Sequence, residues 1–197
     1  VANGEWDSEH IEADKQQRDA LAARGYYEAF QALRGLIQEA HGEGAEDLDL
    51  EYLIDVSITQ IYTSLFKPCV TAGIINERDL AGYRKGPIMI RTSRHMPPQS
   101  EHLMDCMDVL KELIVGEPNF AVKAVLGHLF LGYIHPFPDG NGRTSRFLMN
   151  FIFLLGGYRW TVVPVTERTA YLDALESASI DADVVPFTKF LHNMMPD

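Results

Sequence analysis

Apolar residues recur every three or four positions along most of this chain, and that spacing constrains its fold more than any other feature. The pattern is clear in residues 20–40 and again in residues 50–65, where Asp49 is a candidate helix cap and Pro68 is expected to end the helix. It returns in three later segments, 99–115, 119–134 and 142–155. The sequence therefore predicts a mainly α fold.

One segment departs from the helical spacing. Residues 86–98 are partly β-branched and are bounded by Gly86 and by Pro97 and Pro98. We expect a small β-hairpin there. A length of 197 residues suits one domain, so the predicted architecture is a single-domain helical bundle with one small β-hairpin.

Charge and cysteine content narrow the classes of partner. The chain has 17 lysines and arginines against 28 aspartates and glutamates, which gives a net charge of −11. Nucleic acids and anionic membranes attract broad basic surfaces, so we expect neither as a partner. Only two cysteines are present, and the sequence shows no signal peptide and no apolar run of membrane-spanning length. We therefore expect a cytoplasmic location.

The segment from His135 to Arg146, HPFPDGNGRTSR, has the properties of an anion-binding site. Gly140 and Gly142 stand directly before a predicted helix, where backbone N–H groups are unpaired and the helix dipole is positive. Arg143 and Arg146 are three positions apart, so both guanidinium groups leave the same side of the first turn. Phosphate is the anion that such an arrangement favours.

Two further side chains of this segment suggest chemistry at that phosphate. Asp139 is a hard oxygen ligand of the kind that holds Mg²⁺ beside phosphate groups. His135 is a titratable base at the entry of the loop. Together with the anion site, these residues indicate phosphoryl or nucleotidyl transfer.

The same segment resembles the signature of the Fic family, HPFx(D/E)GNGRxxR, at every defining position. The likeness extends over about residues 45–195. It implies the Fic fold and the transfer of AMP from ATP to a Ser, Thr or Tyr hydroxyl of a target protein, with Mg²⁺ as cofactor and ATP as co-substrate.

The resemblance also implies a role for each motif residue. His135 would be the general base, and Asp139 would bind Mg²⁺. The residues that would hold the phosphates are Gly140, Asn141 and Gly142 in an anion hole, Arg143 at the β-phosphate and Arg146 at the γ-phosphate. We count His135 and Arg143 as the catalytic pair.

Residues outside the motif are assigned in the same way. The 86–98 segment resembles the family's flap, in which Ile88, Met89, Ile90 and Arg91 would pair with the main chain of the target. Tyr171 and Ser179 align roughly with adenosine-pocket positions.

An N-terminal pattern suggests regulation. Many Fic proteins carry an inhibitory helix with the pattern (S/T)xxxE(G/N), and this chain has Ser8 and Glu12 at that spacing, followed by Ala13. Glu12 would then pair with Arg146. The alternatives are that Ser8 and Glu12 only cap and solvate the first helix, or that a separate small antitoxin supplies the helix.

These assignments divide the chain in two. Residues 1–44 would form N-terminal helices, including a candidate inhibitory helix at about 8–22. Residues 45–197 would form the Fic core, with the flap at 86–98 and the catalytic loop at 135–146.

Two other functions use the same residues. The site could remove AMP from a modified protein, as a hydrolase, or the domain could be a non-catalytic nucleotide-binding module. The intact His135 argues against the module, because a binder needs no base there. A homodimer is left open.

Overall fold

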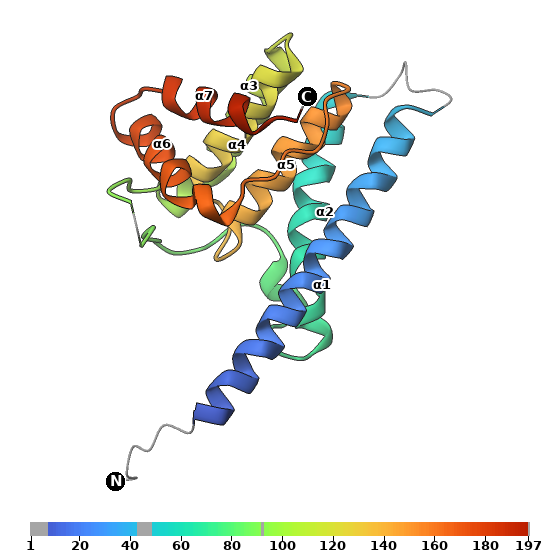
Figure 1. The fold of residues 1–197 in the computed structure, drawn as a ribbon. Helices are drawn as coiled ribbons and strands as arrows, with labels where there is room; N and C mark the ends of the chain where they lie inside the picture. Colours follow the sequence, from blue (N-terminus) through green and yellow to red (C-terminus); the bar gives the residue numbers. More distant parts are fainter. Residues whose placement is uncertain (1–7, 43–48, 92, 197) are drawn as a thin grey trace.

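The computed structural model describes residues 8–42, 49–91 and 93–196, with side chains in the first helix described from residue 16 onward. It is helical, as the spacing predicts (Figure 1). Its α-helices are α1 (Ser8–Ala40), α2 (Leu50–Thr71), α3 (Leu103–Gly116), α4 (Phe120–Ile134), α5 (Asn141–Leu155), α6 (Arg168–Ile180) and α7 (Val185–Met194).

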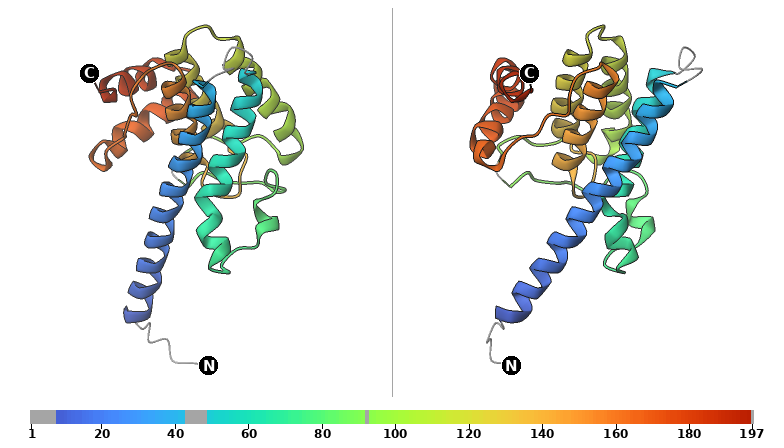
Figure 2. Two further views of the ribbon diagram at one scale, coloured as in Figure 1. Left: turned by 90° about the vertical axis from the view of Figure 1, so that its right-hand side faces the viewer. Right: turned by 45° about the vertical axis from the view of Figure 1, so that its right-hand side comes forward.

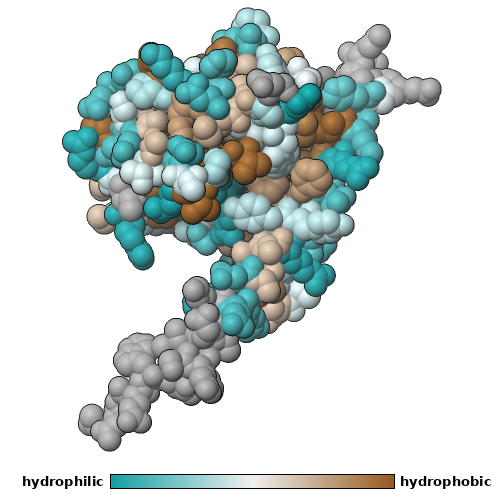
Figure 3. Space-filling model, viewed as in Figure 1, coloured by the Kyte–Doolittle hydropathy of each residue, from teal (hydrophilic) through white to brown (hydrophobic). Residues whose placement is uncertain are grey.

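Helices α4 and α5 form the centre of the domain. The buried side chains of α5 include Phe151 and Phe153, and those of α4 include Leu131. Helices α1 and α2 lie together along one side, with α6 and α7 on the opposite side, and the N-terminal half of α1 extends beyond the body (Figure 2). The face in Figure 3 is largely hydrophilic, with apolar residues gathered over its middle. The loop between α4 and α5 is therefore held by the most buried part of the molecule.

A glycine sets the crossing of α1 and α2. A Cβ atom added to Gly25 would lie 2.1 Å from the backbone oxygen of Leu65, so only glycine allows the two backbones to come this close. Ala29 and Leu33, further along α1, are buried in the same interface. This crossing fixes which residues of α1 reach the centre of the domain.

The hairpin prediction is wrong. In the described part of residues 86–98 the chain is an extended loop without strand pairing. Arg84 accounts for the difference, because its guanidinium donates to the carbonyls of Gly86 at 2.7 Å and Pro98 at 2.5 Å, at the two ends of the segment. A side chain thus closes the loop where main-chain pairing was expected.

The prediction that Pro68 ends a helix is also wrong. Helix α2 contains Pro68 and ends at Thr71. The proline lies in the last turn, where the carbonyl of Pro68 still accepts from the N–H of Ala72 at 3.0 Å. A proline costs one N–H donor, and near a helix end that loss is tolerated. Among the described helices, none is long and apolar enough to cross a membrane.

Candidate active site

The loop begins with a histidine in an unusual backbone conformation. His135 follows α4 with φ 51° and ψ 55°. This is the left-handed region of backbone conformation, which few residues other than glycine adopt. Its Nδ1 lies 3.1 Å from the carbonyl oxygen of Gly132. A carbonyl only accepts, so Nδ1 carries the proton and Nε2 keeps its lone pair. Burial lowers the pKa of His135, which favours the neutral ring.

Arg84 holds this histidine from a distant part of the chain. Its Nε donates to the carbonyl of His135 at 2.8 Å, and its backbone N–H donates to the carbonyl of Pro136 at 2.8 Å. The Arg84 side chain is buried. These bonds fix the backbone on which the imidazole is mounted.

The middle of the loop is anchored in the core. The ring of Phe137 is buried and stacks on Tyr62, with ring centroids 3.8 Å apart and planes inclined by 9°. The Asn141 amide accepts from the N–H of Phe137 at 2.8 Å and donates to the carbonyl of Phe137 at 2.7 Å. The Asn141 side chain therefore shapes the loop, and only its backbone is left for a ligand.

The start of α5 offers N–H groups to an anion. Gly140 has φ 79°, a backbone conformation that favours glycine, and a Cβ atom there would lie 2.7 Å from the ring of Phe66. Both the backbone conformation and the close packing therefore require glycine. The carbonyl of Gly140 accepts from Arg143 and Thr144 at 2.9 Å each. In the described structure the preceding N–H groups, those of Asn141 and Gly142, have no partner, as is usual at the first turn of a helix.

Asp139 and Arg143 lie at the outer edge of this cradle. The Oδ1 of Asp139 accepts from the N–H of Gly140 at 2.6 Å, and its Oδ2 is 3.1 Å from Nη2 of Arg143. The Asp139 carboxylate is 78% exposed. A single open carboxylate beside a phosphate cradle fits Mg²⁺, which takes one or two carboxylates together with phosphate oxygens and water. The described residues contain no ready-made group of three metal ligands.

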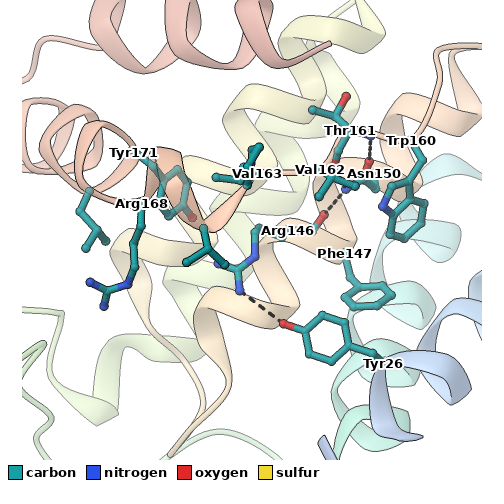
Figure 4. A pocket seen from close by; sticks show the side chains of 13 residues that line it. Tyr26, Arg146, Phe147, Asn150, Trp160, Thr161, Val162, Val163, Arg168 and Tyr171 are labelled. Carbon is teal, nitrogen blue, oxygen red and sulfur yellow. Dashed lines mark hydrogen bonds between the residues drawn. The ribbon is translucent and has the colours of Figure 1, made fainter. Parts of the chain in front are cut away.

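Two cavities meet at Arg146. The first, of about 190 Å³, lies beside the loop and is lined by residues predicted for the site, namely Ile90, His135, Gly142, Arg146, Tyr171 and Ser179. The second, of about 590 Å³, lies beyond Arg146 and includes Tyr26, Trp160 and Arg168 in its lining (Figure 4). Arg146 and Tyr171 belong to both cavities.

Other predicted residues lie away from the smaller cavity or outside the description. Ile88, Met89 and Arg91 do not line it, and Met89 is 79% exposed. Ser8 and Glu12 fall in the first turns of α1, where side chains lie outside the described residues. Along a continuous helix Glu12 precedes Tyr26 by about 21 Å, at about 1.5 Å per residue.

The sequence does not indicate the roles of Arg84 and Tyr26. Tyr26 lies in the predicted helix of residues 20–40, and its hydroxyl is 3.5 Å from Nη2 of Arg146. Both residues act on partners far away in the sequence, so no local pattern could have identified them.

In this helical domain a histidine base, the N–H groups at the start of α5 and the α5 residues Arg143 and Arg146 therefore lie close together around one cavity. The Fic/DOC family model matches residues 48–153, just over half of the chain, and the chain belongs to that family.

Relatives and solved structures agree with this membership. The chain is 28% identical over 178 residues to the protein adenylyltransferase Fic of Drosophila mojavensis, covering 85% of this chain and 35% of the relative. The chain thus spans about a third of the length of that curated relative. Fic-1 of C. elegans (residues 134–508) has the same fold, with a TM-score of 0.68 at 20% identity, covering 98% of this chain and 51% of the other.

A Bartonella structure adds a bound nucleotide. The BepC protein of Bartonella tribocorum was solved with AMPPNP and matches with a TM-score of 0.58 at 14% identity, covering 90% of this chain and 87% of the other.

Proposed function

We propose that this domain transfers AMP from ATP to a Ser, Thr or Tyr hydroxyl of a protein. The observation that carries the proposal is the junction of a base and an anion site: His135, Gly142 and Arg146 line one cavity. The name of the Drosophila relative and the nucleotide held by the Bartonella structure support this choice of donor.

In this proposal His135 takes the proton of the attacking hydroxyl. The free Nε2 of His135 accepts the proton of the target hydroxyl, whose oxygen attacks the α-phosphorus of ATP. The bond between that phosphorus and pyrophosphate breaks, so the products are AMP-modified protein and pyrophosphate. The imidazolium then releases its proton to water.

The remaining groups hold the phosphates. The N–H groups of Asn141 and Gly142 face the charge that develops on the α-phosphate. Arg143 and Arg146 bind the β- and γ-phosphates. Asp139 would hold Mg²⁺, which when bound neutralises part of the phosphate charge.

The extended loop and helix α6 complete the substrate sites in this proposal. Residues 88–91 have no strand pairing in the described structure, where the Ile90 carbonyl accepts from the N–H of Ser93 at 3.0 Å, and we expect the other main-chain groups of Ile88–Arg91 to pair with an extended target segment. Ser179 and the ring of Tyr171 border the smaller cavity and would contact the adenosine. The Tyr171 hydroxyl is hydrogen-bonded to Nε2 of His128 at 2.9 Å. The tyrosine ring is therefore the part that would contact the adenine.

Regulation by Glu12 remains part of the proposal. To reach Arg146, the first turns of α1 would have to bend back, because the described helix brings Tyr26 there instead. If they do not, an antitoxin helix in trans is the next explanation. ATP dependence and the low cysteine count favour the cytoplasm as the place of action.

The test uses ATP labelled at the α-phosphate, incubated with the 197-residue chain, Mg²⁺ and cell lysate. Wild type, Glu12→Gly and His135→Ala run side by side on a denaturing gel. We expect strong labelling of protein with Glu12→Gly, weak labelling with wild type and none with His135→Ala.

The other outcomes separate the alternatives. Label from γ-labelled ATP would mean phosphate transfer and would reject AMP transfer. Loss of AMP from pre-labelled protein, abolished in Glu12→Gly, would indicate the hydrolase. Binding of ATP that His135→Ala leaves unchanged, without turnover in any variant, would indicate the binding module.

A further inference from the structure

The two arginines of the loop have different electrostatic surroundings. Arg143 is paired with the Asp139 carboxylate at 3.1 Å. Among the described side chains, no carboxylate forms an ion pair with Arg146, and its hydrogen-bond partner is the neutral hydroxyl of Tyr26 at 3.5 Å. Arg146 is therefore the arginine whose charge is left for a ligand.

The position of Tyr26 is fixed by the packing of α1. Gly25, its neighbour, packs directly against α2, where an added Cβ atom would meet the Leu65 oxygen. The Tyr26 ring packs against Phe147 of α5, with centroids 5.4 Å apart. The hydroxyl is thereby directed at the guanidinium of Arg146, as Figure 4 shows.

A second phenol lies on the other side of Arg146. Tyr171 of α6 is buried, and Figure 4 shows its hydroxyl directed towards the guanidinium. Its oxygen is 2.9 Å from Nε2 of His128, a buried histidine whose pKa is lowered to about 3 by burial and by the charge of Arg146. His128 is neutral at pH 7, so it adds no charge to the cluster.

The side chains beside Arg146 are phenols and not carboxylates, and this affects the charge of Arg146. Burial by itself lowers the pKa of Arg146, but the oxygens of Tyr171 and Tyr26 raise it, so the group stays charged. A phenol oxygen accepts a hydrogen bond without neutralising the cation, whereas a carboxylate would compete with a bound phosphate.

We propose that Tyr26 is a positioning residue for Arg146: with Tyr171 opposite, it holds the guanidinium at the junction of the two cavities, ready to bind the terminal phosphates of the nucleotide. The inference rests on the proposed function for the identity of the ligand. It assigns to α1, outside the motif, a part in distinguishing a nucleoside triphosphate from a monophosphate.

The test compares Tyr26→Phe with Tyr27→Phe in the 197-residue chain. Tyr27 is the adjacent tyrosine and is 65% exposed, so it is a matched control. Calorimetric titration with ATP and with AMP gives the readout. We expect Tyr26→Phe to raise the Kd for ATP about two- to tenfold, the range for one lost hydrogen bond, with the Kd for AMP unchanged. Tyr27→Phe should match wild type for both nucleotides.

A third variant sharpens the result. Tyr26→Glu places a carboxylate beside Arg146 and should weaken ATP binding more than Tyr26→Phe does, again without changing AMP binding. The proposal is overturned if Tyr26→Phe binds ATP as wild type does, or if it loses ATP and AMP affinity equally, which would mean a general structural defect.

A measurement without nucleotide separates this inference from the proposed function. Guanidinium resonances in ¹⁵N NMR spectra report how freely an arginine side chain rotates, and Arg146→Lys identifies the signal. We expect slower rotation of Arg146 in wild type than in Tyr26→Phe, and equal rotation would overturn the inference. Failure of wild type to bind ATP would instead reject the proposed function, while the NMR comparison would still decide whether Tyr26 holds Arg146.

Discussion

The guanidinium of Arg84 donates a hydrogen bond of 2.8 Å to the backbone carbonyl of His135, 51 positions further along the chain. The same guanidinium binds the carbonyls of Gly86 and Pro98, which begin and end the extended loop. One buried side chain therefore fixes both the backbone of the proposed base and the segment proposed to receive the target.

Replacing Arg84 should affect stability and activity together. Arg84→Ala leaves three carbonyl groups without their donor, and we expect the free energy of unfolding to fall by about 3 kcal/mol. AMP transfer should fall more steeply than stability explains, because His135 loses its backbone support. Arg84→Lys should recover only part of the loss, since lysine lacks the planar fork of donors. Chemical denaturation and initial rates check this, with exposed Arg78→Ala as the unaffected control.

Asn141 should be needed for the shape of the loop. Asn141→Ala removes both hydrogen bonds to Phe137, and we expect a loss of about 2 kcal/mol in unfolding free energy. Asn141→Asp keeps an acceptor for the Phe137 N–H but puts a carboxylate at the anion cradle. It should therefore weaken ATP binding at least as much as Asn141→Ala does. Better ATP binding by the aspartate variant would contradict an anion site at this position.

The pH dependence of AMP transfer should reflect the lowered pKa of His135. Burial is the main cause, and the base works only when it is unprotonated. The rate should therefore stay constant as pH falls to about 6.5, the ordinary histidine pKa, and decline only below it. Initial rates at saturating ATP between pH 5 and 8 measure the acid limb. A midpoint above pH 6.5 would argue against a buried neutral base.

His128 should make the fold sensitive to acid. Its pKa is lowered to about 3 in the folded protein, so between pH 6.5 and about 3 the unfolded chain binds a proton that the folded chain does not. Stability from this group is complete above pH 6.5 and is lost as pH falls. His128→Gln should reduce the slope of unfolding free energy against pH by about 1.4 kcal/mol per unit in that window. Urea titrations at several pH values, with exposed His192→Gln as control, show whether the slope changes.

Two glycines of α1 should respond oppositely to alanine. Gly25→Ala places a Cβ atom against the Leu65 oxygen, and we expect a loss of about 1–3 kcal/mol as the helices separate. Gly35 has nothing within 4 Å of its added Cβ, so Gly35→Ala should be neutral or stabilising by up to about 1 kcal/mol. Thermal unfolding of both variants measures the difference. A stable Gly25→Ala would mean that the crossing of α1 and α2 is looser than described.

The helices and the loop could be predicted because their determinants are local. Periodic apolar residues define α1 to α5, and the prolines and glycines of His135–Arg146 mark the turn into α5. The chemistry proposed for that loop also followed from residues within twelve positions of one another. The roles of individual site residues, including Glu12, stay predictions.

The failures come from interactions between distant residues. The segment after Gly86 has the composition of a hairpin, but Arg84 satisfies its end carbonyls and Glu176 accepts from Ser93 and from the N–H of Arg94, so strand pairing does not form. A proline removes a donor and is therefore expected to end a helix, yet the carbonyl of Pro68 still closes the last turn of α2. Tyr26 and Arg146 are 120 positions apart, and only the fold brings them together.

The segment matched by the family model contains only part of the cluster formed by Tyr26, Arg146 and Tyr171. Residues 48–153 include Arg146, while Tyr26 precedes them and Tyr171 follows them. A fragment limited to these residues would keep the whole motif but would lose the hydroxyl groups of Tyr26 and Tyr171, which border Arg146. The smallest piece of this chain that reproduces the site must therefore begin before Gly25 and continue through α6.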